Sequence, residues 1–135
     1  MHAVVSRLAR FGRAATVTVT SSLGCVVCER CAVADTAPAR MRGLLGRSDL
    51  EPGEGVLLRP APSIHTWFMR FAIDAVFLDK DLCVLEVREN LTPWRFAARR
   101  GARAVLELAA GEAHRRGIAP GQRLIVSATT MAERA

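Results

Sequence analysis

Residues 63–80 read SIHTWFMRFAIDAVFLDK and set ionisable side chains among large apolar ones. Two extended pieces are predicted here, at 64–69 and 73–78, because both are rich in β-branched and aromatic residues. Asp74 begins an apolar stripe along the second piece, where an unpaired carboxylate would be costly. We therefore expect the fold to supply a partner for this carboxylate.

Strand parity separates the polar residues of this segment. If the two pieces form a hairpin with a three-residue loop, Arg70 and Asp74 share a face and His65 lies on the other. An Arg70–Asp74 ion pair is then expected, either as a structural clamp or as one wall of an anion-binding pocket. His65 is the natural candidate for a general base, because the pKa of imidazole lies near neutrality. A bulge or another register would be needed to bring it to Asp74.

Short strands dominate the remainder of the chain. Thr36 is a plausible N-cap for a short helix that ends at Gly46, and residues 112–116 can form about one helical turn. With little room for crossover helices, the sequence predicts a mainly β (α+β) fold, a compact antiparallel barrel or sandwich with two or three short helices. The other predicted strands are 16–20, 25–35, 55–59, 82–89, 103–111 and 123–128.

The length of 135 residues suits one domain with a single core. Hydrophobic residues make up 50% of the chain and charged residues 24%, which is typical of folded domains. We expect an N-terminal extension at 1–23, a single β-rich domain at 24–128 and a C-terminal tail at 129–135. The first fourteen residues are also compatible with a short basic amphipathic helix.

Charge and hydropathy narrow the class of partners. The formal net charge of +6 attracts anions in general, but the arginines are scattered and adjacent only at 99–100 and 115–116, so the sequence does not favour nucleic acid. No apolar run reaches the length of about eighteen residues that a membrane span needs. Arginines also interrupt each apolar stretch near the start, so we expect a cytoplasmic protein. The oligomeric state is left open.

Three cysteines form a Cys-x-x-Cys-x-x-Cys run, which in isolation suggests zinc or an iron–sulfur cluster. On a regular strand Cys28 would point away from Cys25 and Cys31, and those two would lie about 20 Å apart at roughly 3.3 Å per residue. They could not converge on one ion. We therefore expect three small strand residues, no metal and no cofactor.

The sequence allows either a buried or an exposed environment for Glu107 and for the two tryptophans. A solvated edge position would explain Glu107, whereas on a buried face its carboxylate would have to pair with an arginine such as Arg40 or Arg47. Trp67 and Trp94 are predicted to be core or rim residues. They would suit a carbohydrate ring if both were exposed on one side of the domain.

Three motifs occur in order: ARMRGLLGR at 39–47, SIHTWFMRFAIDAVFLD at 63–79 and AVLELAAGEAHRRGIAPGQRL at 104–124. Together they resemble the domain-of-unknown-function family 192, a bacterial and archaeal family. The resemblance implies a compact, mainly β single domain with short helices and no established reaction. The family's recurrent polar residues fall here on Arg40, Arg47, His65, Thr66, Arg70, Asp74, Asp79 and Glu107.

Two positions depart from the family pattern. Many relatives have an asparagine where this chain has Phe71. Relatives with the His-Thr motif often have a cysteine just before it, where this chain reads Ala61-Pro62. Any chemistry that depends on that cysteine is therefore absent here.

We expect a binding module with a polar, arginine-containing pocket for a small anionic or sugar-like ligand. One alternative is a hydrolase or transferase that uses His65 as general base, so whether the chain is an enzyme stays open. Another is a structural or protein-interaction module without a small-molecule site. The candidate ligand-binding residues are Arg40, His65, Thr66, Arg70, Asp74, Asp79 and Glu107.

Overall fold

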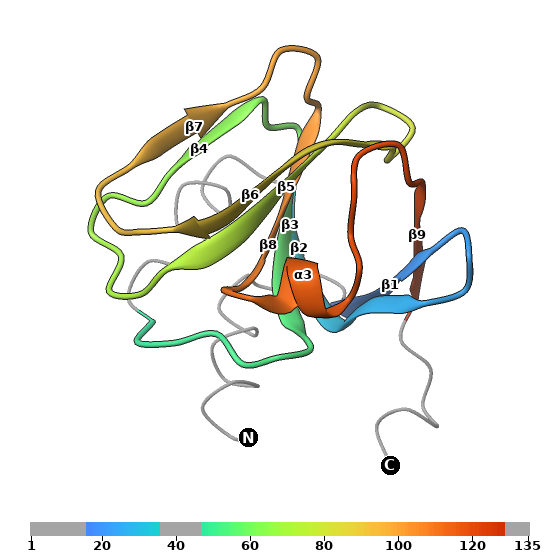
Figure 1. Cartoon of the computed structure of the whole chain (residues 1–135), viewed down its shortest axis with the longest axis horizontal. Helices are drawn as coiled ribbons and strands as arrows, with labels where there is room; N and C mark the ends of the chain where they lie inside the picture. The colour runs from blue at the N-terminus through green and yellow to red at the C-terminus, as the bar shows by residue number, and fades with distance from the viewer. Residues whose placement is uncertain (1–15, 36–46, 129–135) are drawn as a thin grey trace.

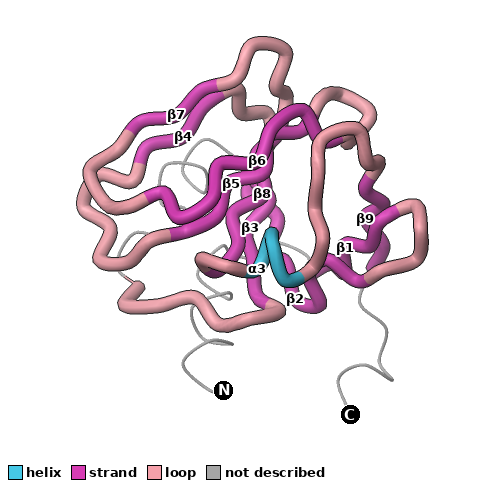
Figure 2. Tube along the Cα trace, in the orientation of Figure 1, coloured by secondary structure: helices cyan, strands magenta, loops and turns pink. Residues whose placement is uncertain are grey.

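The computed structural model describes residues 16–35 and 47–128, and these fold into two β-sheets with one short helix among them (Figure 1). Strands account for most of the regular structure, and the single described helix is one turn long (Figure 2). The elements in chain order are β1 (Thr16–Ser21), β2 (Val26–Ala34), β3 (Glu54–Leu58), β4 (Ser63–His65), β5 (Ile73–Leu78), β6 (Val84–Leu91), β7 (Phe96–Ala98), β8 (Ala104–Ala109), α3 (Glu112–Arg115) and β9 (Leu124–Ala128).

The larger sheet has seven strands in the order β6-β5-β8-β3-β2-β1-β9. Strands β2 and β3 run parallel, whereas every other neighbouring pair in this sheet is antiparallel. The edge strands β6 and β9 approach each other at the isolated bridge between Cys83 and Arg123 and at flanking backbone hydrogen bonds, such as Val84 N–H to Gln122 O at 2.8 Å, but they do not pair as neighbours, so the sheet is not closed into a barrel. The predicted mainly β class is confirmed, but the sheet is mixed rather than wholly antiparallel.

The predicted strands at 16–20, 25–35, 55–59, 73–78, 82–89, 103–111 and 123–128 are confirmed as β1, β2, β3, β5, β6, β8 and β9. The one-turn helix predicted at 112–116 is α3. Two or three helices are not supported, since the described part of the chain contains this one alone. The helix predicted at 36–46 lies outside the described residues, as do residues 1–15 and 129–135. The proposed domain boundaries remain a prediction, although β1 already pairs with β2 and β9.

The predicted hairpin of 64–69 with 73–78 is wrong. Strand β4 ends at His65 and pairs with β7, while β5 pairs with β6 and β8. Phe68 has a φ of 67°, which an extended strand cannot accommodate, so the chain turns after Thr66. The segment that opens the family motif therefore belongs to the smaller sheet.

Strand β5 separates two hydrophobic clusters, because its side chains alternate between the faces of the sheet. Val76 and Leu78 pack on one face, together with Leu106, Leu108 and Ala113 of α3. Ile73, Ala75 and Phe77 pack on the other face, together with residues of the smaller sheet, Ile64 of β4 and Ala97 of β7. The smaller sheet is thus held against the larger one by a shared core. No helix of the described residues is long and apolar enough to cross a membrane.

Candidate binding site

Asp74 is fully buried on β5, and backbone groups satisfy it. Its Oδ1 accepts the N–H of Asn90 at 2.8 Å, and its Oδ2 accepts the N–H groups of Gly111 at 3.0 Å and Ala113 at 2.9 Å. The carboxylate therefore fixes the end of β6 and the start of α3. The predicted Arg70–Asp74 ion pair is wrong, because Arg70 is exposed and forms no ion pair in the described part of the chain.

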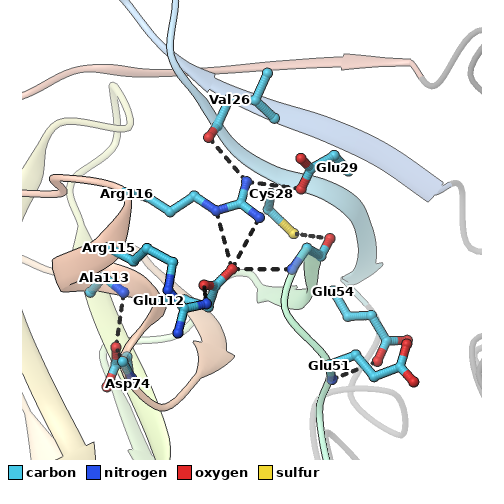
Figure 3. Close-up of polar contacts among 12 residues, drawn as sticks. Val26, Cys28, Glu29, Glu51, Glu54, Asp74, Glu112, Ala113, Arg115 and Arg116 are labelled. Carbon is cyan, nitrogen blue, oxygen red and sulfur yellow. Dashed lines mark hydrogen bonds and ion pairs between the residues drawn. The ribbon is translucent and has the colours of Figure 1, made fainter.

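A second carboxylate at the start of α3 extends this support (Figure 3). The Oε1 of the buried Glu112 accepts the N–H of Gly53 at 3.2 Å and pairs with Arg116 at 3.0 Å. Arg116 also pairs with Glu29 at 2.8 Å and donates to the carbonyl oxygen of Val26 at 3.1 Å. This network could not be predicted from the sequence, since its members lie up to 90 residues apart. Its contacts are internal, so it anchors α3 to β2.

Asp79 closes the turn between β5 and β6. Its Oδ1 accepts the N–H of Asp81 at 2.8 Å and that of Cys83 at 3.0 Å. A carboxylate that accepts backbone N–H groups two and four residues ahead is a common turn stabiliser. This geometry gives Asp79 a local role in the fold.

Glu107 lies in the interior, on β8 between β5 and β3, with 4% of its surface exposed. The structure thus selects the buried reading over the solvated edge. Arg47 is buried as well but pairs with Glu54 at 3.1 Å, while Arg40 lies outside the described residues. Among the described residues the Oε1 of Glu107 has no hydrogen-bond partner, and desolvation raises the pKa of this carboxyl to about 8. Glu107 therefore carries its proton at neutral pH.

Glu107 belongs to a polar patch on one face of the larger sheet. Val56 lies opposite Glu107, and Glu54 lies two residues before Val56 and opposite Arg30, so the three polar side chains share a face. In the described ranges, every buried side-chain nitrogen or oxygen without a partner belongs to this patch. The atoms are Arg30 Nε, Arg47 Nε and Nη1, Glu54 Oε2 and Glu107 Oε1.

The smaller sheet and its flanking loops display an unusual group of exposed rings, which we call the aromatic face. It consists of His65, Trp67, Phe68, Trp94 and Phe96. The rings of His65 and Trp67 stack with centroids 4.5 Å apart and planes inclined by 24°. Those of Phe68 and Trp94 lie 4.8 Å apart at 60°. Phe96 is the cross-strand partner of His65, which puts both side chains on one side of the sheet.

The aromatic face is exposed to solvent. Exposed fractions are 45% for Trp67, 70% for Phe68, 59% for Trp94 and 62% for Phe96. The chain has five phenylalanines, two tryptophans and no tyrosine, so both tryptophans and two of the phenylalanines gather here. Trp67 and Trp94 are therefore not core residues, and the alternative of a rim position or of a stacking surface stays open. Exposed apolar side chains that gather in this way are unusual on a folded domain, so the aromatic face is the candidate binding surface.

Thr66 joins the two loops that carry the rings. Its hydroxyl donates to the carbonyl oxygen of Thr92 at 2.7 Å and accepts the N–H of Arg95 at 2.8 Å. Its backbone N–H donates to Arg95 O at 2.8 Å, and its carbonyl oxygen accepts the N–H of Trp94 at 3.0 Å. Thr66 is fully buried beneath the exposed rings. It therefore positions them without facing the solvent itself.

Two of the rings stand on backbone that ordinary residues avoid. Phe68 has a φ of 67° and Trp94 a φ of 66°, both in the left-handed region. Each such residue costs on the order of 1 kcal/mol, and bulky side chains are rare there. Phe68 comes from the β4 loop and Trp94 from the loop before β7, and their rings are in contact. Each of the two loops therefore presents a ring to the aromatic face from left-handed backbone. Strained residues of this kind concentrate at functional sites.

The loops around the aromatic face are basic. Segments 63–73 and 91–103 contain arginines at 70, 95, 99, 100 and 103 and no aspartate or glutamate. Arg99 pairs with Glu86 at 3.3 Å. Arg70 and Arg95 are exposed and form no ion pair among the described residues. The exposed rings therefore share their two segments with exposed guanidinium groups, which can bind an anion.

The imidazole of His65 is bound by the neighbouring backbone. Its Nδ1 accepts the N–H of Trp67 at 3.3 Å, which in a neutral imidazole puts the proton on Nε2. No carboxylate pairs with His65 in the described part of the chain. Asp74 cannot serve it, since that side chain is buried and already accepts three backbone N–H groups.

The cysteine run does not alternate as a regular strand would. Val17 pairs with Cys31 and Val19 with Cys28, so β2 has one residue more than β1 over this stretch, and the bulge turns Cys28 and Cys31 into the same core cluster. The predicted opposite orientation of these two is therefore wrong. The hydrogen bond with the neighbouring Cys28 thiol and burial raise the pKa of Cys31. Cys25 is exposed, apart from them.

Of the predicted ligand residues, the structure brings His65, Thr66 and Arg70 together on one loop and places Asp74, Asp79 and Glu107 elsewhere. The sequence analysis did not single out Phe68, Arg95 and Phe96. The signal available in the sequence was that segments 63–73 and 91–103 are rich in arginine and aromatic residues and contain no acidic residue. The sequence does not show that these two segments lie side by side, because β4 and β7 are about thirty residues apart in the chain.

Comparisons with known proteins agree with this fold. The model of DUF192, a family described as an uncharacterised ancient conserved region (ACR), matches residues 17–126. A protein of unknown function from Novosphingobium aromaticivorans DSM 12444 is 29% identical over 82% of this chain and 83% of that chain, with a TM-score of 0.71. A candidate transcription regulator from Sinorhizobium meliloti 1021 is 25% identical over 83% of this chain and 92% of that chain, with a TM-score of 0.73. No curated protein matches the chain.

Proposed function

This chain belongs to the DUF192 family, and we propose that it is a binding module whose aromatic face takes a sugar-like ligand with an anionic group. The observation that carries the proposal is the exposed group of rings beside two arginines that form no ion pair in the described part of the chain. The proposal places the ligand on a surface, at the smaller sheet. It does not use the buried patch around Glu107.

The chemistry of the face matches such a ligand. Aromatic rings stack on the apolar side of a sugar or on any other flat ring, and they gain most where water is displaced. A guanidinium group forms paired hydrogen bonds with a carboxylate or a phosphate. The Nε2–H of a neutral His65 adds a donor for a hydroxyl or an anion.

In this proposal His65, Arg70 and Arg95 contact the ligand and Thr66 positions the rings. Asp74 and Asp79 support the fold through backbone N–H groups. Arg40 keeps its status as a sequence-based candidate. In the described part of the chain no carboxylate pairs with His65, which favours binding over hydrolysis or group transfer.

Intrinsic fluorescence tests the proposal directly, because both tryptophans lie on the aromatic face and the chain has no tyrosine. Sugar phosphates and sugar acids should change the emission in a saturable way, while the parent neutral sugars should bind more weakly. Arg70→Ala and Arg95→Ala should each weaken the response by about tenfold, the effect of losing one charged contact of about 1.4 kcal/mol. Arg123→Ala is the matched control, since Arg123 is exposed next to β9, which lies away from β4 and β7 (Figure 1).

The proposal fails if no sugar acid or sugar phosphate changes either the fluorescence or the melting temperature. It also fails if Arg123→Ala weakens binding as much as Arg70→Ala and Arg95→Ala do. That result would mean that only the overall charge attracts the ligand.

A further inference from the structure

We infer that the ligand of the aromatic face is single-stranded nucleic acid, with bases stacked on the exposed rings and phosphates held by the flanking arginines. This inference rests on the proposed function and names its ligand class. A nucleotide is a sugar with an anionic group, and its base adds a flat ring. The structure supplies two reasons to prefer a strand of nucleotides to a single sugar, and a third reason to prefer a single strand to a duplex.

The number of rings is the first reason. The face offers two ring pairs, His65 with Trp67 from the β4 segment and Phe68 with Trp94 across the two loops, and the exposed Phe96 follows on β7. One sugar covers one or two rings, whereas successive bases of a strand can use several. Stacking of a base on an aromatic side chain is worth about 1–3 kcal/mol and tolerates any base.

The charge pattern is the second reason. Arginines occupy positions 70, 95, 99, 100 and 103 of the two segments, and neither segment contains an acidic residue. The formal net charge of the whole chain is +6. A row of phosphates matches a spread of cationic groups better than one anion does. The arginines looked scattered along the chain, but the pairing of β4 with β7 brings both segments to one sheet.

The accessibility of the rings is the third reason. Phe68 and Trp94 are held on left-handed backbone with more than half of each residue exposed, so their rings face solvent instead of the core. Ring faces can stack only on bases that are themselves unstacked. A duplex buries its base faces in its own stack, which favours single strands over duplexes here.

The test is a fluorescence titration of the whole chain with an oligothymidylate of about ten nucleotides. We expect saturable quenching and binding at least about 100-fold tighter than that of thymidine monophosphate, because several rings and phosphates act together. Inorganic polyphosphate of equal charge should bind more weakly and leave the emission unchanged. If the strand contacts two phosphates, raising the salt concentration should weaken binding with a log–log slope of about −1.4.

Variants localise the site while keeping both tryptophans as reporters. Phe96→Leu removes an exposed ring and should weaken strand binding about tenfold, and Arg95→Ala should also reduce the salt slope by about 0.7. Arg123→Ala should bind the strand as the unchanged chain does. Circular dichroism checks that each variant is folded.

The outcomes separate this inference from the proposed function. Equal affinity for the decamer and the monophosphate, a duplex that binds as tightly as the single strand, or equal quenching by polyphosphate would overturn the inference. Binding of sugar acids would still support the proposed function in those cases. If neither oligonucleotides nor sugar acids bind, both fail.

Discussion

The hydroxyl of Thr66 accepts the backbone N–H of Arg95 at 2.8 Å, across 29 residues of chain. The same hydroxyl donates to Thr92 O at 2.7 Å. A single buried oxygen thus ties the β4 loop to the loop before β7 and fixes the distance between two sets of exposed rings. The aromatic face depends on this contact.

Replacing Thr66 with valine keeps the shape of the side chain and removes the hydroxyl. Two backbone groups then lose their buried partner, so the free energy of unfolding should fall by about 1–3 kcal/mol. Tryptophan emission should also change, because Trp67 and Trp94 flank the joined loops. Urea unfolding followed by fluorescence measures both effects.

Thr92→Val is the matched control, because Thr92 contributes only its backbone oxygen to this contact. Its stability and emission should equal those of the unchanged chain. Equal stability of the Thr66→Val and Thr92→Val variants would contradict the joining role of Thr66.

Asp74→Asn should destabilise the fold strongly. An amide keeps one acceptor oxygen but presents N–H groups where the second carboxylate oxygen now accepts two backbone N–H groups. Hydrogen bonds to a charged group are worth about 1.5–3 kcal/mol, so we expect a loss of about 3 kcal/mol in chemical denaturation. Asp81→Asn, at an exposed position, should cost under about 0.5 kcal/mol. A small loss at Asp74 would mean that α3 does not need this anchor.

Glu107 should make the stability depend on pH. Folded Glu107 keeps its proton up to about pH 8, whereas a glutamate of ordinary pKa, 4.5, ionises earlier in the unfolded chain. As pH rises between these values, the folded state binds more protons than the unfolded state, so the contribution of Glu107 to stability falls. It is constant below about pH 4.5 and levels off above about pH 8.

Glu107→Gln cannot ionise, so the variant should lack this fall. From pH 5 to pH 8 the variant should therefore gain stability relative to the unchanged chain. At about 1.4 kcal/mol per pKa unit, the difference in unfolding free energy should change by a few kcal/mol. Glu89→Gln, at an exposed position, is the control and should show a pH-independent difference. Parallel pH curves for Glu107→Gln and the unchanged chain would show that the carboxyl is not held neutral.

Gly55→Ala should also be costly. A Cβ at this position would lie 2.9 Å from the Glu107 carbonyl oxygen and 2.9 Å from the Cys28 sulfur, at the centre of the larger sheet. The backbone cannot move away at this position, so we expect the free energy of unfolding to fall by about 3 kcal/mol. Gly24→Ala meets no atom within 4 Å and should cost only about 1 kcal/mol, from its φ of 92°. Similar thermal stability of both variants would show that the sheet can yield at Gly55.

The seven strands of the larger sheet were predictable, because alternation and β-branched residues act locally. Strand β5 shows this well, since Val76 and Leu78 pack on one face and Ile73 and Phe77 on the other, as their parity requires. The partner of Asp74 was not predictable. Its partners are backbone N–H groups, which every residue except proline carries and which leave no mark in the sequence.

The bulge in β2 changes the face to which the following side chains point, because it adds one residue to the strand. It puts Cys28 and Cys31 on the same side of the sheet, although regular alternation would separate them. The left-handed turn at Phe68 acts similarly by ending the expected hairpin. Both features depend on backbone conformations that a composition rich in strand-forming residues does not reveal.

By itself the sequence determined the mainly β class, most strand positions and the burial of an ionisable group on β5, because these follow from side-chain period and polarity. Only the tertiary structure decided which residues meet. It paired β4 with β7, joined their loops through Thr66 and Arg95, and gathered Trp67, Phe68, Trp94 and Phe96 on one exposed face. The physical reason is that contacts between distant segments depend on register and backbone turns, which neighbouring side chains do not specify.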